Sequence, residues 1–313
     1  MFDVQMTEGV RITMDEKDYI ILQHIYQERN ITKAAERLYM TQPSLTYRLQ
    51  QIEKHLGVQL FVRYGKTLEF TPEGEYIVAF AQKMLANIQN LRDHLTNMKS
   101  QLHGVLRIAA ANITARFYLP EVLKNFTTQY PNIKINIKTG LSLDVLDMLE
   151  NDSIHVGIIR GDYNWPEGKI LISSENICLI SKDPIDMAKL PQLNQVYYRP
   201  NNIPASHAKY NTEDRFSLFR KIQAWWYERY SVPPLVTMEV GSYEACKEMV
   251  VNGFGYAFIP RLFIKPEDKL YTEDLVLKNG EVILRNTWLL YRYSHLQLRH
   301  VQKFIEYIKS LPR

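Results

Sequence analysis

The sequence predicts a mixed α/β protein that begins with a helix-turn-helix and a β-hairpin, continues through one long helix, and ends in a two-lobed α/β domain. Residues 30–70 hold two short helical patterns around a tight turn, followed by a strand-turn-strand pattern. Residues 73–102 carry apolar side chains every three or four positions, and residues 104–313 alternate between strand and helix patterns. A chain of 313 residues is long enough for two or three domains, each with its own core.

Two short helices and a tight turn account for residues 30–57. Asn30 and Thr41 are N-cap residues, since their side-chain oxygens can accept hydrogen bonds from the first free backbone amides of each helix. Pro43 fits the first turn of the second helix, where its missing amide proton costs little, and Gly57 suits the end of that helix. The apolar residues at helical spacing are Ile31, Ala34, Ala35 and Leu38 in the first helix and Leu45, Leu49, Ile52 and Leu56 in the second.

The opposite face of the second helix is polar and basic, with hardly any acid. From Arg29 to Lys66 the chain has seven basic residues against two acidic ones, although its net charge is only +4. Side chains of this kind can hydrogen-bond to base edges in a major groove and to phosphates. The local charge therefore predicts a DNA-binding surface. The candidate contacts are Thr32, Gln42, Pro43, Ser44, Thr46, Tyr47, Arg48, Arg63 and Lys66.

A strand-like pattern over 58–70, with a turn at 64–66, predicts a β-hairpin wing beside the second helix. Arg63 and Lys66 on this wing would meet a DNA backbone. The alternative for residues 30–57 is an ordinary helical hairpin with a solvated polar face, since such hairpins are common. The wing favours the DNA-binding interpretation.

The order and spacing of several short motifs resemble the winged helix-turn-helix of LysR-type transcriptional regulators. The motifs are the alanine pair, Thr-Gln-Pro, Ile-Glu followed by Leu-Gly, Leu-Phe-x-Arg and Thr-Pro-x-Gly, within AAERLYMTQPSLTYRLQQIEKHLGVQLFVR and LEFTPEGE. The resemblance implies a regulator that binds promoter DNA as a homo-oligomer, with a tetramer favoured over a dimer. It also implies a small-molecule effector and contact with RNA polymerase.

Residues 14–72 form the expected DNA-binding domain. Residues 15–29 read as its first helix, with Tyr19, Leu22, Ile25 and Tyr26 facing inward. Residues 1–13 are an irregular extension, which is either native or the product of an upstream start codon.

Residues 73–103 predict a linker helix that pairs with a second copy of itself. Pro72 fits the start of the helix, and acids in its first turn complement the helix dipole. The apolar positions form a near-heptad seam, the pattern of a coiled coil. The alternative is that this seam packs on its own domain. The seam residues are Ile77, Phe80, Met84, Ile88, Leu91, Leu95, Met98 and Leu102.

Residues 104–313 predict a two-lobed, periplasmic-binding-protein-like effector domain, because the strand-helix alternation crosses twice between two groups of elements. Lobe I is expected at 104–175 and 275–313, and lobe II at 176–274. The run VVNGFGYAFIP resembles the LysR-type motif near the end of the second lobe. Expected strands are 105–111, 133–139, 156–160, 171–181, 195–198, 236–239, 257–259 and 282–293, and expected helices are 114–129, 142–151, 215–230, 242–252 and 295–311.

An effector site is expected where helices begin beyond strand ends in both lobes. Ligands of open α/β sheets bind there, and free backbone amides with hydroxyls favour a carboxylate or another anion. Plain helix capping is the alternative for each position taken alone. Arg160, at the end of a strand, adds positive charge or lies at the surface. By resemblance, the other contacts fall near Asn112, Thr114, Ser142, Tyr198 and Ser242.

Catalysis, metal binding and a cofactor find no support in the sequence. The chain has no HExxH, GxSxG or P-loop motif and no clustered metal-ligand spacing, so no enzyme is expected. His155 is isolated, whereas His295 and His300 are expected on the exposed face of the last helix. Cys178 and Cys246 are expected to be reduced and buried, with a redox-sensing pair as the alternative.

Two functions from different classes remain. The first is a cytoplasmic transcriptional regulator of the LysR type, in which a small-molecule effector changes promoter binding and bending. The second is a cytosolic protein that binds or sequesters small molecules without regulatory DNA binding. The cytoplasm is the expected location, because the apolar runs are too short for a membrane span and the sequence has no signal-peptide pattern.

Overall fold

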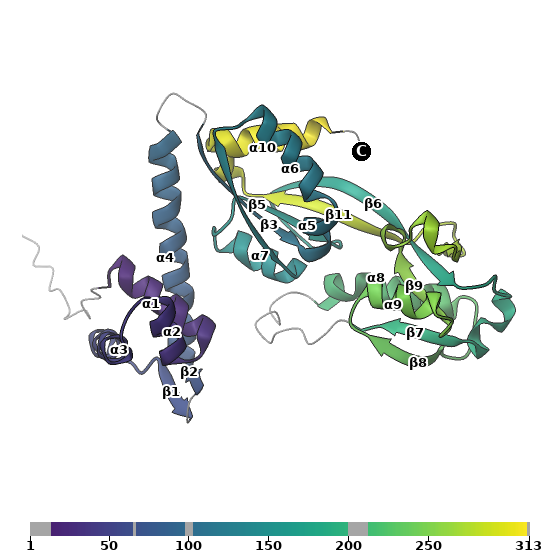
Figure 1. The fold of residues 1–313 in the computed structure, drawn as a ribbon, viewed down its shortest axis with the longest axis horizontal. Coiled ribbons are helices and arrows are strands. Elements are labelled where there is room, and N and C mark those ends of the chain that lie inside the picture. The colour runs from purple at the N-terminus through teal and green to yellow at the C-terminus, as the bar shows by residue number, and fades with distance from the viewer. Residues whose placement is uncertain (1–13, 65–66, 98–102, 200–211, 312–313) are drawn as a thin grey trace, which may run out of the picture. The chain divides into compact units, whose positions relative to one another are not determined.

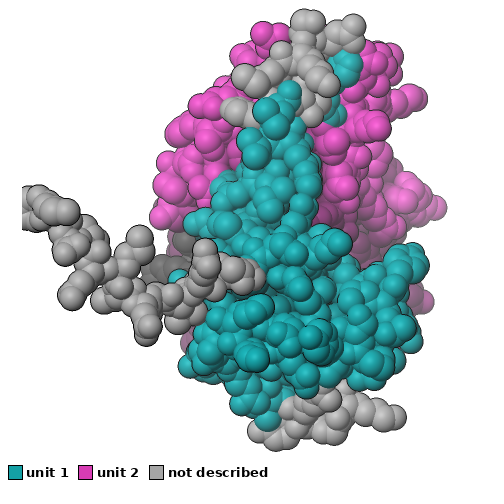
Figure 2. All heavy atoms as spheres, turned by 90° about the vertical axis from the view of Figure 1, so that its left-hand side faces the viewer, with its two compact units in different colours: residues 1–104, 150–154 teal, residues 105–149, 155–313 magenta. Residues whose placement is uncertain are grey.

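The chain divides into two compact units, coloured separately in Figure 2: residues 1–104 with 150–154, and residues 105–149 with 155–313. The computed structural model describes residues 14–64, 67–97, 103–199 and 212–311. The predicted extension at 1–13 lies outside the described residues.

The first unit has the predicted helix-turn-helix, wing and long helix (Figure 1). The predicted caps are present: the Asn30 side chain accepts a hydrogen bond from the Lys33 amide at 3.1 Å, and Thr41 accepts one from the Ser44 amide at 3.4 Å. Gly57 ends the second of these helices with a φ of 68°. The elements are α1 (Glu16–Glu28), α2 (Ile31–Arg37), α3 (Gln42–Leu56), β1 (Phe61–Tyr64), β2 (Thr67–Phe70) and α4 (Pro72–Asn97).

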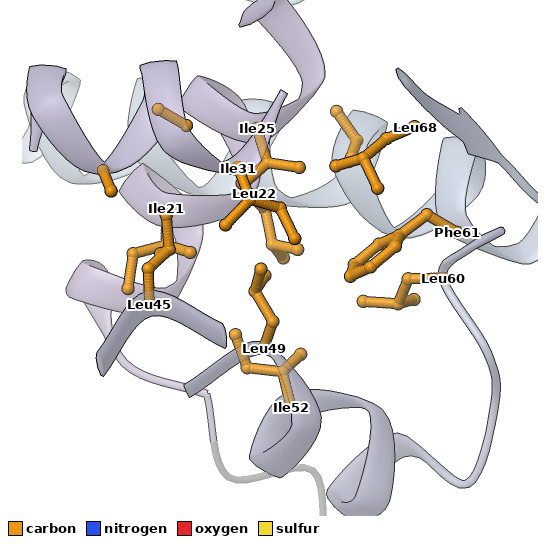
Figure 3. Close-up of a cluster of buried hydrophobic side chains, with 14 residues drawn as sticks. Ile21, Leu22, Ile25, Ile31, Leu45, Leu49, Ile52, Leu60, Phe61 and Leu68 are labelled. Carbon is orange, nitrogen blue, oxygen red and sulfur yellow. The ribbon is translucent and has the colours of Figure 1, made fainter. Parts of the chain in front are cut away.

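One hydrophobic core joins these elements (Figure 3). The fully buried alanines Ala34 and Ala35 of α2 let the neighbouring helices approach closely. The wing closes the core through Phe61 and Leu68. The core residues labelled in Figure 3 are Ile21, Leu22, Ile25, Ile31, Leu45, Leu49, Ile52, Leu60, Phe61 and Leu68.

Helix α4 packs the first part of its seam on its own domain, since Ile77 contacts this core and the Phe80 ring lies 6.2 Å from that of Tyr19. Val78 and Ala81 are buried against the helix-turn-helix core. Leu91 and Leu95 of the predicted seam are 61% and 56% exposed. The part of the seam around Leu91 and Leu95 is therefore open to another chain, whereas its last two predicted members, at 98 and 102, lie outside the described residues.

Tyr39, in the turn between α2 and α3, predicts an unusual mutational result. It has a φ of 54° and is 99% exposed, so its side chain packs on nothing while its backbone is in the left-handed region. We expect Tyr39→Gly to raise the free energy of unfolding by about 0.5–1 kcal/mol in urea titrations, because glycine adopts this conformation without a Cβ penalty. Tyr39→Ala keeps the strain, so a similar gain in that control would contradict the explanation.

The second unit is built on a curled mixed sheet in which two long strands, β6 and β11, pass between the lobes (Figure 1). The strand order is β4-β3-β5-β11-β6-β9-β7-β8, and β10 pairs with β6. The first part of β6 pairs with β11, and its last part pairs with β9. The strands are β3 (Gly104–Ala111), β4 (Ile133–Gly140), β5 (Val156–Arg160), β6 (Gly168–Ser181), β7 (Asn194–Tyr198), β8 (Leu235–Val240), β9 (Tyr256–Pro260), β10 (Tyr271–Asp274) and β11 (Leu284–Tyr291).

The helices of the second unit follow the predicted order. In lobe I they accompany β3, β4, β5 and β11, and in lobe II they pack beside β7, β8 and β9 (Figure 1). They are α5 (Asn112–Phe117), α6 (Leu119–Gln129), α7 (Ser142–Glu150), α8 (Thr212–Tyr227), α9 (Tyr243–Val251) and α10 (Arg299–Ser310). The apolar side chains of β6 and β9 face α8 on one side and α9 on the other, which gives lobe II two clusters of buried residues.

The structure corrects four predictions about lobe I. The expected helix at 114–129 is two helices, α5 and α6, because Pro120 lacks the amide proton that would continue the first. The last helix begins at Arg299, after a short 3₁₀ turn. His300 and His295 are buried rather than exposed, since α10 turns His300 onto the same face as its apolar residues. His155 is likewise not isolated, because its ring centroid lies 5.4 Å from that of His295 and 5.3 Å from that of His300.

Within the described ranges, no helix is both long enough and apolar enough to cross a membrane.

Candidate functional site

The exposed side of α3 is the first candidate site. Thr41, Gln42, Pro43, Ser44 and Tyr47 are exposed along one side of its first two turns. The Gln42 side-chain amide donates a hydrogen bond to the Thr46 hydroxyl at 3.2 Å, which fixes the direction of both groups. The face therefore presents donors and acceptors in a defined arrangement, as direct readout of base edges requires.

Arg48 lies beside this face but is held by α1. Its guanidinium donates to both carboxylate oxygens of Asp18, at 2.5 and 2.9 Å, and to Asp15 at 3.3 Å. Asp18 is only 1% exposed, whereas the Arg48 side chain is 41% exposed. The hydrogen bond to Asp18 raises the pKa of Arg48 above its ordinary value. Arg48 thus links α3 to α1. Because its charge is paired with Asp18 and Asp15, it adds less positive charge to the DNA-binding surface than the sequence suggests.

Other predicted DNA contacts lie on α2 and the wing. Thr32 is exposed on α2. Arg63 belongs to β1, where its backbone pairs with Leu68, but its side chain is outside the described part of the chain. Lys66 also lies outside the described residues. Two further basic residues of the region are paired: Arg37 with Glu28 at 2.8 Å, and Arg29 with Glu75 at 3.9 Å.

The second candidate site is a cavity of about 520 Å³ in the second unit, lined by α5, β5, β6, β11 and the short helical turn after β9. Two predicted effector residues, Thr114 and Arg160, line it. Thr114 is buried, and its hydroxyl has no hydrogen-bond partner among the described residues. A ligand in this cavity can supply that partner.

Charged side chains concentrate around the cavity. Arg160 forms a buried ion pair with Glu175, and Glu175 also accepts a hydrogen bond from the backbone amide of Leu262 at 3.2 Å. Arg261 lines the cavity and pairs with Asp274 at 2.5 Å, while Arg285 donates to the Arg160 carbonyl at 3.3 Å. Three arginines against two carboxylates make the site net positive, which suits an anionic ligand.

The other predicted effector residues have different positions. Ser142 is occupied by Arg160, since its hydroxyl accepts from the Arg160 amide at 3.1 Å and lies 3.2 Å from the Arg160 carbonyl. Ser242 caps α9 by accepting from the Ala245 amide at 3.1 Å, which is the capping role that the sequence left open. Asn112 is exposed at the start of α5, and Tyr198 lines a different cavity.

Sequence reasoning missed Glu175, Asp18 and Arg261. Glu175 lies in a strand whose other residues, apart from Lys169, are apolar or neutral, and Asp18 lies on the apolar face of α1. A charged residue in such a position needs a partner, because burying an unpaired charge is costly. This rule could have identified Glu175 and Asp18 as residues that need a charged partner. It could not have identified Arg160 and Arg48 as those partners.

The Arg160–Glu175 pair predicts a specific dependence of stability on pH. Burial raises the pKa of Glu175 above 4.5, against the opposing effect of Arg160. On raising the pH above 4.5, the unfolded chain therefore loses this proton before the folded protein does, which disfavours folding. We expect the melting temperature of the wild type to fall relative to Glu175→Gln as the pH rises through this region. If the melting temperature of the wild type instead rises relative to that of Glu175→Gln over this pH range, the direction of the pKa shift is contradicted.

The two cysteines are free and buried. Desolvation raises the pKa of Cys178 and of Cys246 to about 12. Both thiols are thus protonated near neutral pH, and a protonated thiol is a poor nucleophile. This favours the interpretation as reduced, structural residues over a redox-sensing pair.

Two family models match the chain. Residues 17–75 match "Bacterial regulatory helix-turn-helix protein, lysR family", and residues 99–312 match "LysR substrate binding domain". In Bacillus subtilis (strain 168), the uncharacterized HTH-type transcriptional regulator YraN is 38% identical over 95% of this chain and 98% of its own length. The corresponding regulator YkuM is 33% identical over 91% of this chain and 93% of its own.

Solved structures with the same fold include two proteins of low sequence identity. The full-length protein CbnR, crystallised with its target DNA, has a TM-score of 0.63 and 19% identity, covering 95% of this chain and 99% of its own. The Vibrio cholerae virulence activator AphB has a TM-score of 0.56 and 16% identity, covering 95% and 99%.

The fold, the two family matches and these relatives define the class of this protein. The chain belongs to the LysR family of bacterial helix-turn-helix transcriptional regulators, with a DNA-binding domain followed by a substrate-binding domain.

Proposed function

We propose that this regulator reads promoter DNA with the exposed side of α3 and that a small anion in the Arg160 cavity controls its DNA complex. The arrangement of Gln42, Ser44 and Tyr47 on one uncovered face carries the DNA part of the proposal. Pro43, Thr46 and Thr32 flank these contacts, and Arg63 and Lys66 of the wing contact the phosphates. Arg48 positions α3 and touches DNA only at its edge. The protein works in the cytoplasm, in keeping with its class.

The proposed assembly is a homodimer through α4, joined into a homotetramer through the second units. Leu91 and Leu95 lie uncovered on the seam, and apolar side chains at heptad spacing are stabilised by pairing with a second helix. Leu91→Glu with Leu95→Glu should lower the molecular mass in sedimentation by at least half. Ala79→Glu changes an exposed residue of the same helix that lies away from the seam, so it should leave the mass unchanged.

The proposed effector is a carboxylate or a similar small anion. It would lie near Arg160 and Arg261 and accept a hydrogen bond from the unpartnered Thr114 hydroxyl. Binding can change the DNA complex only if the anion prefers one arrangement of the lobes over the other. Contact with RNA polymerase would then follow from altered bending of the promoter.

A titration tests this site. Small carboxylates and inorganic phosphate are added to the wild type and to Thr114→Val, with binding measured by calorimetry and DNA bending by fluorescence energy transfer. Thr114→Val should stay folded, because the lost hydroxyl has no partner among the described residues, and should bind the active anion about tenfold more weakly. Anion binding that is equal in the two proteins would refute the site. DNA binding without any response to anions would leave the DNA-binding role standing and refute the effector role.

A further inference from the structure

Lobe II contains a second cavity, of about 250 Å³, between β7 and α8. Among the described residues, it shares no lining residue with the Arg160 cavity. Its wall is mainly aromatic: seven of the twelve lining residues are Phe, Tyr or Trp, including Tyr198, Phe219 and Trp226.

Several rings of the wall pack against one another. The ring centroids of Tyr198 and Tyr243 are 4.0 Å apart, and the rings of Tyr198 and Phe219 are stacked at 6.1 Å with an interplanar angle of 20°. Stacked and tilted rings of this kind favour contact with another ring. Small ligand cavities of this apolar character typically hold a few placed polar groups that orient the ligand.

The cavity carries no formal charge, in contrast to the Arg160 cavity. None of the described residues that line it is Asp, Glu, Lys, Arg or His. Burial raises the pKa of Tyr198 and of Tyr197, so both phenols are neutral near pH 7. An anion would have no cationic side chain among the described lining residues and would lose its hydration.

One buried polar group in the wall lacks a partner. Gln195, in β7, is only 3% exposed, and its side-chain oxygen has no hydrogen-bond partner among the described residues. Leaving a buried acceptor without a donor costs free energy, so a donor in the cavity would be stabilising. The unsatisfied oxygen therefore selects a ligand with an N–H or O–H group.

We infer that this cavity is a second ligand site, for a neutral one- or two-ring aromatic molecule whose N–H or O–H donates to Gln195. The site is independent of the anion proposed for the Arg160 cavity, because the two differ in charge, lining and ligand. Since β7 pairs with β9, and β9 pairs with β6, the aromatic ligand would stiffen the lobe II part of the sheet.

Phenol is the probe for this site, and benzene and benzoate are its comparisons. Saturation-transfer NMR and competition titrations on the full-length protein should detect phenol and benzene, with benzoate much weaker. Gln195→Leu should weaken phenol binding by about tenfold and leave benzene unchanged, because only phenol donates to the lost oxygen. Thr114→Val, in the other cavity, should leave phenol binding as in the wild type.

A filling variant gives a second readout. Ile222→Trp should block both phenol and benzene, because Ile222 lines the cavity. Ala224→Trp adds the same side chain at an exposed position of α8 outside the cavity wall and should change nothing. Thermal melts establish that each variant is folded. No saturation transfer to phenol at millimolar concentration would overturn the inference. Phenol binding unaffected by Gln195→Leu, or lost in Thr114→Val, would also overturn it.

Discussion

Replacing Arg48 with alanine should abolish specific DNA binding and lower the free energy of unfolding of the first unit by about 2 kcal/mol. Asp18 is almost fully buried, and both of its oxygens accept from Arg48. Without the guanidinium, the contact that this carboxylate keeps among the described residues is the hydrogen bond from the Asp15 amide at 3.1 Å. The orientation of α3 on α1 is then lost together with the buried ion pair. Urea denaturation and DNA-binding anisotropy measure the two effects.

Two matched variants separate positioning from contact. Gln42→Ala removes an exposed side chain, so it should weaken DNA binding by about tenfold while leaving stability within about 0.5 kcal/mol of the wild type. Adding Asp18→Asn to Arg48→Ala removes the stranded charge and should recover part of the lost stability without restoring DNA binding. If Arg48→Ala is as stable as Gln42→Ala, then Arg48 does not position the helix.

Gly74→Ala should destabilise the first unit by about 3 kcal/mol, although alanine is the better helix former. A Cβ at Gly74 would lie 1.9 Å from the backbone carbonyl oxygen of Leu60, which cannot move without displacing the entry to the wing. That carbonyl also accepts from the Thr71 amide at 3.0 Å, and Thr71 in turn caps α4 through the Gly74 amide at 3.0 Å. The substitution thus separates the long helix from the wing. Thermal melts measure the loss.

The control for Gly74→Ala lies one residue earlier. Glu73→Ala introduces the same side chain at an exposed position of the same turn and should change the free energy of unfolding by no more than about 0.5 kcal/mol. A Gly74→Ala protein as stable as this control would mean that the close approach of α4 to Leu60 is not a constraint. The comparison is informative because replacing glycine by alanine at an uncrowded helix position would raise the free energy of unfolding.

Local patterns explain how much of the fold the sequence predicts. Caps such as Asn30, Thr41 and Gly57 act on residues three or four positions away, so the helix boundaries in the first unit follow from the sequence. The periodicity of apolar residues likewise identifies the buried faces of α3 and of the strands in the second unit. The break before α6 could also have been read from Pro120.

Long-range pairs explain what the sequence did not predict. Arg48 and Asp18 are thirty residues apart, and the sequence identifies each as a charge without identifying the pair. Tyr198 is the last residue of β7, as expected, yet its ring faces the aromatic cavity of lobe II because α8 packs beside β7. His155 meets His295 only when the start of β5 and the 3₁₀ turn before α10 come together. Such contacts depend on the tertiary structure rather than on local spacing.

In vitro selection from a random duplex library tests the central claim, that the exposed side of α3 reads DNA sequence. The full-length wild type should enrich one motif with two related half-sites, because paired α4 helices present two reading surfaces. Its affinity for that motif should exceed its affinity for random duplex by at least about a thousandfold at physiological salt and should fall steeply as salt is raised. The Gln42→Ala variant should enrich the motif weakly, or should lose the preference for one base at one position of the motif. Enrichment of no sequence over the starting library by the folded wild-type protein would contradict the account.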